Sequence, residues 1–258
     1  MRLSAIPAAF PPTPADFWQP LIGDGAFAVT RSMIVILLSV ALISGVLLLV
    51  TKQMQVVPAK GQYLAESVYG LVRNSIARDM IGEKEFRPFL PLLFTQFTLI
   101  LVNNLFGIIP FVQFPTFSRI GFAVAVTLVV FVVYHYIGVQ RQGFVGYFKH
   151  MVPAGVPAGV IPLIFLLELI TYFVTRPLTL GMRLFANMFA GHMLLLVFIL
   201  GGEVMLNSDS LFLRIAAFGS FGMGIVMTFF ELLVQFLQAY VFVLLTAFYI
   251  ASSLAEEH

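Results

Sequence analysis

The sequence predicts an all-α integral membrane protein with about five hydrophobic segments plus a surface helix, in which the last two segments form a long tilted hairpin. Of the 258 residues, 60% are hydrophobic and only 10% are charged, and the mean hydropathy is +1.00. A soluble domain does not need so much apolar surface. Several charge-free stretches reach the roughly 20 residues that a helix needs to cross a bilayer. These stretches are apolar at nearly every position, whereas the strands of a β-barrel would alternate between apolar and polar residues.

Composition also excludes several classes of site. The chain has no cysteine, which rules out disulfides and thiolate metal sites, and we expect neither a metal ion nor a cofactor. A net charge of +2 is too small to indicate a nucleic-acid partner. The positions of the basic residues are instead explained by which loops face the cytoplasm.

Residues 1–30 lack an uninterrupted apolar run and do not resemble a signal peptide. They read as an external arm, either irregular and held at the membrane surface by Trp18 or disordered. Residues 31–258 then form a single membrane domain. Its predicted spans are 32–50, 88–110, 120–139, 161–200 and 211–254.

The first loop, 51–87, holds six of the fourteen Lys and Arg residues. Its residues 63–77 mix apolar and charged positions at helical spacing, which predicts a helix lying on the membrane surface. The positive-inside rule places this loop and the loop at 140–160 in the cytoplasm and the N-terminus outside. Five spans then put the C-terminal residues 255–258 in the cytoplasm.

The last two segments are too long for perpendicular spans, because forty helical residues extend for about 60 Å. We therefore expect a tilted, bent hairpin, with Pro177 in its first helix. No soluble domain and no internal repeat is found in the sequence.

Charged and polar side chains gather in this hairpin, where each buried charge costs roughly 2.5–3.5 kcal/mol. Several together predict a site that is lined by protein or hydrated. They are Glu168, Arg176, Thr179, Arg183, Asn187 and His192 in the first segment, and Glu231, Gln235 and Gln238 in the second.

Helical spacing divides these residues into faces. At about 100° per residue, Glu168, Arg176, Thr179 and Asn187 all fall within about 60° of Arg183, whereas His192 falls about 180° away. On the second helix, Gln235, Gln238 and Tyr249 lie within about 40° of Glu231. We therefore expect Arg183 and His192 to face different surroundings.

Simpler interpretations stand beside each functional one. Arg176 could be a snorkelling residue at a helix end, Glu168 could simply pair with Arg176, and His192 could be a packing residue. Three amides could be hydrogen-bonding links between helices: Asn187, Gln235 and Gln238. Glu231, between two large apolar neighbours, is the hardest to explain structurally.

The string RPLTLGMRLFANMFAGH at 176–192 closely resembles the signature of subunit a of F-type ATP synthases. Glu231, seven residues before QAYVF at 238–242, strengthens the resemblance, as do Asn104-Leu105 and the closing EEH at 256–258. The resemblance covers most of the chain from about residue 88.

This resemblance implies a non-catalytic stator subunit that abuts a ring of c subunits, alongside peripheral-stalk b subunits and other ATP synthase subunits. Protons would cross through two offset half-channels. Arg183 would be the fixed charge, Asn187, His192, Glu231 and Gln238 would line the outer half-channel, and Glu168, Arg176 and Thr179 would lie near the cytoplasmic one. Gly107 departs from the pattern, because some relatives have an aspartate there.

The coupling ion could be H⁺ or Na⁺, and the titratable His192 favours H⁺. The membrane would be a bacterial plasma membrane, with the mitochondrial inner membrane as the alternative. The main competing function is a secondary transporter or ion channel with a buried Arg/Glu site. Such proteins usually show repeat symmetry, which this chain lacks. A non-conducting scaffold would not explain why costly charges are kept in the membrane.

Overall fold

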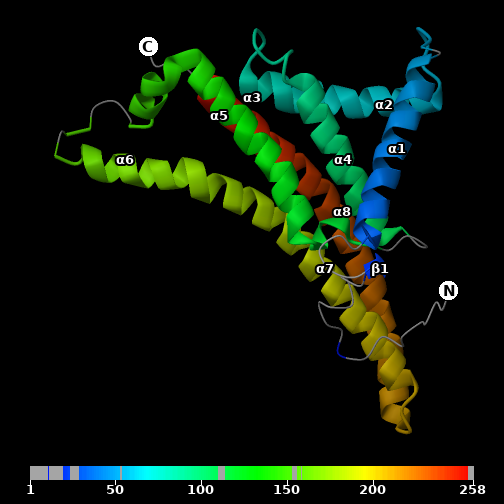
Figure 1. Cartoon of the computed structure of the whole chain (residues 1–258). Coiled ribbons are helices and arrows are strands. Elements are labelled where there is room, and N and C mark those ends of the chain that lie inside the picture. The colour runs from blue at the N-terminus through cyan, green and yellow to red at the C-terminus, as the bar shows by residue number, and fades with distance from the viewer. Residues whose placement is uncertain are drawn as a thin grey trace.

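Five helices that are long and apolar enough to cross a membrane form the body of the protein. The computed structural model describes residues 11, 20–23, 29–52, 54–109, 114–152, 156–157 and 159–254. The predicted fold class is confirmed, including the long C-terminal helical hairpin (Figure 1). The membrane-crossing stretches are α1 (Arg31–Lys52), α4 (Leu90–Ile108), α5 (Ile120–His150), the continuous stretch Ile161–Leu206 and α8 (Leu211–Leu254).

A short helical rod lies across one end of the bundle, where the sequence predicts a surface helix. It consists of α2 (Lys60–Gly70), a π-helical segment η2 (Leu71–Arg78) and one further turn, α3 (Asp79–Ile81). Its polar face is exposed, and a side-chain hydrogen bond with Glu83 raises the pKa of the exposed Arg78 guanidinium. Val72 and Ile76 on its inner face are fully buried, so the rod closes this end of the core.

Helix α5 continues to His150, beyond the predicted end of the third span at Val139. The chain bends at Gly143, whose φ of 71° lies in the left-handed region that favours glycine. Gly143 therefore divides α5 into two helical parts that meet at a kink. Arg141, just before the bend, pairs with Glu85 at 2.7 Å near the rod.

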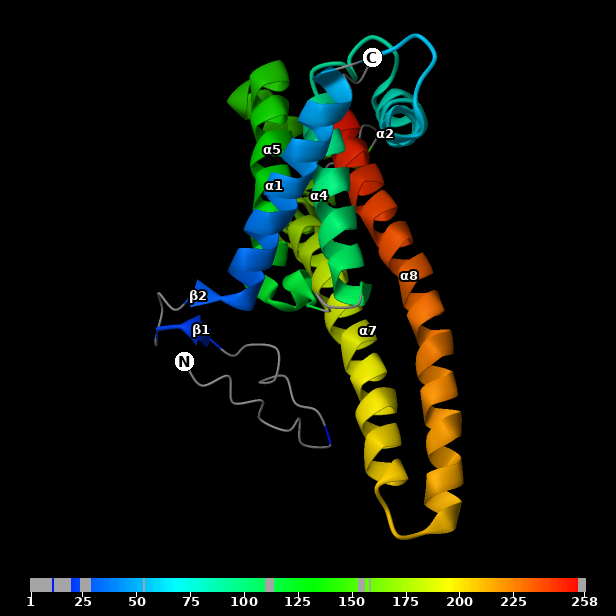
Figure 2. The same ribbon diagram turned by 90° about the vertical axis from the view of Figure 1, so that its right-hand side faces the viewer.

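The C-terminal hairpin has a bent first arm. Helix α6 (Ile161–Ile170) runs through a π-helical segment, η4 (Thr171–Thr175), into α7 (Arg176–Leu206), and the chain turns downward in Figure 1 near this junction. Pro177 lies in the first turn of α7, and because the helix continues directly from η4, its missing N–H removes one helical hydrogen bond near the bend. The hairpin of α7 and α8 extends past the other helices, as Figure 2 shows. This is the bent, tilted hairpin that the sequence predicts.

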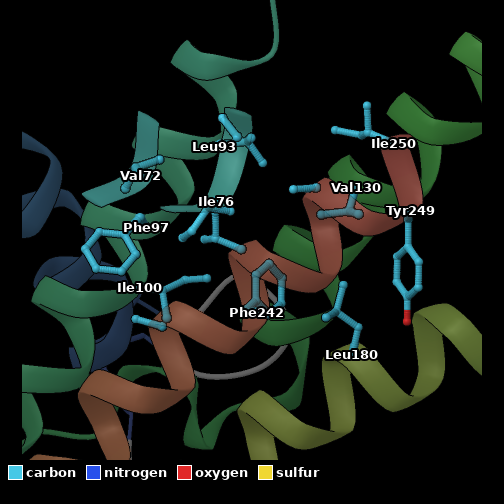
Figure 3. Packing of buried hydrophobic residues seen from close by; sticks show 14 of the residues in the cluster. Val72, Ile76, Leu93, Phe97, Ile100, Val130, Leu180, Phe242, Tyr249 and Ile250 are labelled. Atoms are coloured by element: carbon cyan, nitrogen blue, oxygen red, sulfur yellow. The ribbon is translucent and has the colours of Figure 1, made fainter. Parts of the chain in front are cut away.

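The core lies where α4, α5, α7 and α8 meet beneath the rod. Figure 3 shows Phe97 and Ile100 of α4, Val130 of α5, Leu180 of α7 and Phe242 of α8 converging there. Most outward-facing residues on the long helices are large and apolar, as expected for helices in lipid. The buried core therefore fixes α7 against α8, and that interface carries the polar side chains.

Two short antiparallel strands, β1 (Pro20–Ile22) and β2 (Val29–Thr30), precede α1. The sequence predicts an irregular arm here and gives no sign of a hairpin. Trp18, the proposed anchor, and the C-terminal residues 255–258 lie outside the described residues.

Candidate functional site

His192 of α7 and Glu231 of α8 form a buried pair. The His192 Nδ1 lies 2.8 Å from the Glu231 Oε1, and each residue is only 6% exposed. The Gln235 amide, one turn further along α8, donates a hydrogen bond of 2.9 Å to the same carboxylate oxygen. The two helices thus bring together a histidine and a carboxylate that are 39 residues apart (231 − 192).

Helix α4 completes this cluster from a third direction. The Gly107 carbonyl oxygen lies 2.9 Å from the His192 Nε2, and the Asn104 side chain donates a 3.0 Å hydrogen bond to the Gln235 carbonyl oxygen. Gly107 takes part through its backbone alone, since it has no side chain. No motif identifies that contact, because every residue carries a carbonyl.

Several polar atoms in and beside this cluster are buried without a hydrogen-bond partner in the part of the chain that the structure describes. Buried polar atoms are normally satisfied by protein or ordered water, and a polar site of this kind suits water. The atoms are Asn104 Oδ1, Glu231 Oε2, Gln235 Oε1 and Gln238 Nε2.

Arg183 lies on a different side of α7. Its side chain is exposed, whereas His192 is buried, so the sequence correctly separates the surroundings of the two residues. Arg183 forms no hydrogen bond or ion pair with any residue that the structure describes. Thr179 is also exposed, and Asn187 is half-buried.

Arg176 has aromatic partners. Its guanidinium carbon lies 3.6 Å from the centre of the Tyr172 ring and 5.1 Å from that of Tyr249, and its Nη1 donates to the Ser252 hydroxyl at 3.3 Å. The interpretation that Glu168 pairs with Arg176 is wrong, since the described residues show no ion pair between them. The π-helical segment η4 separates these two residues, so a count of 100° per residue does not carry through to Glu168.

Sequence reasoning missed a second histidine, half-buried near Arg176. His135 of α5 packs against the rings of Phe131 and Phe173, at centroid distances of 4.2 and 4.4 Å, and its Nδ1 lies 3.4 Å from the Tyr147 hydroxyl. A histidine within the apolar third segment was the available signal. No group of three or more His, Asp or Glu side chains suited to a metal ion occurs in the part of the chain that the structure describes.

Comparisons with known proteins agree with one another. The family model described as ATP synthase A chain matches residues 33–251. An ATP synthase subunit a of Nocardioides sp. is 42% identical over 260 residues, covering 96% of this chain and 94% of the relative. The subunit a of Streptomyces lividans is 40% identical, covering 93% of this chain and 86% of the relative. The subunit a of Rhodococcus erythropolis is 39% identical, covering 96% of this chain and 91% of the relative. The chain therefore belongs to the ATP synthase A chain family, whose members include these a subunits.

Proposed function

We propose that the chain is the stator subunit through which protons cross the membrane, past a ring of c subunits, to drive ATP synthesis. The observation that carries the proposal is Arg183, an exposed cation within the membrane-crossing stretch Ile161–Leu206 that has no hydrogen bond or ion pair among the described residues. An uncompensated charge there costs roughly 2.5–3.5 kcal/mol. A carboxylate on an adjacent subunit would remove that cost.

A guanidinium suits this role because it stays protonated even when largely desolvated, whereas a lysine ammonium can lose its proton. Near Arg183, a ring carboxylate is favoured in its ionised form and releases its proton. Once it has moved past Arg183, the carboxylate binds a proton again from the other side. Each proton carried across supplies about 2.3 kcal/mol per 100 mV to rotation.

The His192–Glu231 cluster suits the outer half-channel. His192 lies nine residues beyond Arg183, about 13.5 Å along α7, toward the hairpin turn and away from the basic rod (Figure 1). The buried polar atoms without partners support a hydrated path beside it. Asn187 and Gln238 extend this path toward the ring.

The cytoplasmic half-channel lies in the opposite direction along α7. Arg176 and Thr179 are on that side of Arg183, and Glu168 follows on α6. The aromatic contacts of Arg176 hold its charge near the α8 terminus, where it repels protons from the ring and promotes their release into the cytoplasm.

The chain is a multi-pass membrane component of an ATP synthase, and its relatives named above are bacterial. We place it in the bacterial plasma membrane, with the basic rod toward the cytoplasm and the N-terminal arm outside. Its role is non-catalytic. Its further partners are the peripheral-stalk b subunits.

Cross-linking tests the proposed ring contact. The chain has no native cysteine, so an introduced cysteine gives a maleimide photo-cross-linker a single attachment site on this chain, in a complex whose other subunits have had any cysteine replaced. Ala190→Cys, exposed about 20° from Arg183 on α7, is expected to label a c subunit. Leu48→Cys, 70% exposed on α1, is the control and is not expected to label one. Labelling of lipid alone at position 190 would contradict the proposed contact.

A further inference from the structure

Both ring nitrogens of His192 face hydrogen-bond acceptors. The Nε2 lies 2.9 Å from the Gly107 carbonyl oxygen, and the Nδ1 lies 2.8 Å from the Glu231 Oε1 and 3.2 Å from the Met188 carbonyl oxygen. A backbone carbonyl oxygen accepts hydrogen bonds and cannot donate them. The Nε2 therefore carries a hydrogen.

With a hydrogen on Nε2, the contact between Nδ1 and the Glu231 Oε1 is a hydrogen bond only if a second proton lies between these two atoms. Either His192 is an imidazolium beside an ionised Glu231, or a neutral His192 accepts from a protonated Glu231. A neutral imidazole beside an ionised carboxylate would leave one bare nitrogen facing an oxygen in either tautomer. Such an arrangement is costly in a buried site. The pair is therefore neutral overall and holds one proton between Nδ1 and Oε1.

We propose that the Gly107 carbonyl keeps this proton resident, and that the transported proton passes instead through the free Oε2 of Glu231. The inference rests on the proposed function. Oε1 is occupied by His192 and by the Gln235 amide, whereas Oε2 has no hydrogen-bond partner among the described residues. Oε2 is thus the oxygen that is open to an incoming proton.

The step balances in protons and charge. A proton from the outer water path bonds to Oε2, so that Glu231 becomes a neutral acid beside a His192 imidazolium and the pair goes from a charge of zero to +1. The Oε2–H bond then breaks as the next carrier takes the proton, and the resting pair returns. His192 holds Glu231 in place and does not itself carry the moving proton.

Two glycines make room for the pair. A Cβ on Gly107 would lie 2.5 Å from the His192 Cε1 and 2.8 Å from its Nε2, and a Cβ on Gly191 would lie 2.8 Å from the Glu231 Oε1. Ordinary contact begins at 3.4 Å, so a methyl group at Gly107 must displace the ring by about 1 Å. A displacement of that size can cost about 100-fold in rate. Gly107 and Gly191 are therefore positioning residues.

Alanine variants of these glycines test the positioning. In the whole complex reconstituted into vesicles, Gly107→Ala and Gly191→Ala are expected to slow ATP-driven proton translocation per assembled complex by about 100-fold. Gly202→Ala is the matched control, because its Cβ would crowd only the Phe221 ring of the same hairpin, at 2.9 Å. It is expected to retain a near wild-type rate per assembled complex.

A double variant separates positioning from general damage. If Gly107 acts through His192, Gly107→Ala adds no further loss in a His192→Gln background. Additive losses would overturn the inference. If His192→Gln and Glu231→Gln both left translocation intact, the proposed function would fail. If both slowed translocation while Gly107→Ala did not, only the role of Gly107 would be refuted.

Nitrogen NMR shows directly which ring nitrogen of His192 carries a hydrogen, and it needs no variant of Gly107. The wild-type complex would be labelled with ¹⁵N-histidine, and the His192 signal identified by its loss in His192→Gln. We expect a protonated Nε2. A His192 protonated only on Nδ1, in complexes that translocate protons, would overturn the proposal.

Discussion

Replacing Arg183 by alanine is the sharpest test of the proposed mechanism, because the structure predicts that function and folding will separate. The side chain is exposed and has no hydrogen bond or ion pair among the described residues, so its removal breaks no such contact there and should leave the fold intact. A unit charge 4 Å from a ring carboxylate is worth about 4 kcal/mol at an effective dielectric constant of about 20. Loss of that attraction corresponds to about 1000-fold in rate.

The assay is ATP synthesis by the complex in vesicles, driven by an imposed proton gradient, together with passive proton leak. Arg183→Ala is expected to lower synthesis by about 1000-fold and to raise the leak, since the charge that repels protons between the half-channels is gone. Arg183→Lys should also fail, because an ammonium can lose its proton where a guanidinium does not. Normal synthesis with alanine would refute the charge mechanism. Near wild-type coupling with lysine would refute the argument for a guanidinium.

Three further substitutions test other parts of the site. Glu231→Gln should slow proton translocation by about 100-fold or more while the complex still assembles, as judged by subunit stoichiometry; an unchanged rate would make Glu231 structural. Asn104→Leu removes the hydrogen bond to the Gln235 carbonyl and should cost about 1 kcal/mol, seen as a lower thermal midpoint of the detergent-solubilised complex. Arg176→Gln should lose about 1–2 kcal/mol of aromatic stacking by the same measurement and slow proton release; an unchanged midpoint would show that the Tyr249 and Tyr172 contacts add no stability.

The sequence predicts the hairpin well because a membrane helix is recognised from the residues of its own segment alone. Solid apolar runs identify membrane helices whatever their partners, and α7 is continuous from Arg176 to Leu206. The angular count between Arg183 and His192 therefore holds. The buried face of α8, with Glu231, Gln235 and Gln238, follows in the same way.

The missed features depend on backbone geometry or on distant partners. The π-helical segment η4 changes the register between Glu168 and Arg176, and nothing in residue types fixes where such a segment occurs. The Gly107 contact is made by a carbonyl oxygen, which has no sequence signature. The aromatic surroundings of His135 arise only when α5 packs beside Phe173.

The two faces of α7 also constrain the proton route. Glu231 cannot hand its proton straight to a carboxylate beside Arg183, because His192 lies about 13.5 Å along α7 from Arg183 and on another face. Helix α8 runs antiparallel to α7 (Figure 2), so the seven residues from Glu231 to Gln238 cover about 10.5 Å in the direction of Arg183. Gln238 therefore lies near the level of Arg183, and its Nε2 is buried without a hydrogen-bond partner among the residues that the structure describes. A proton that leaves Oε2 of Glu231 thus has a polar route along α8. It reaches the ring carboxylate only after it has moved along α8 to the level of Gln238.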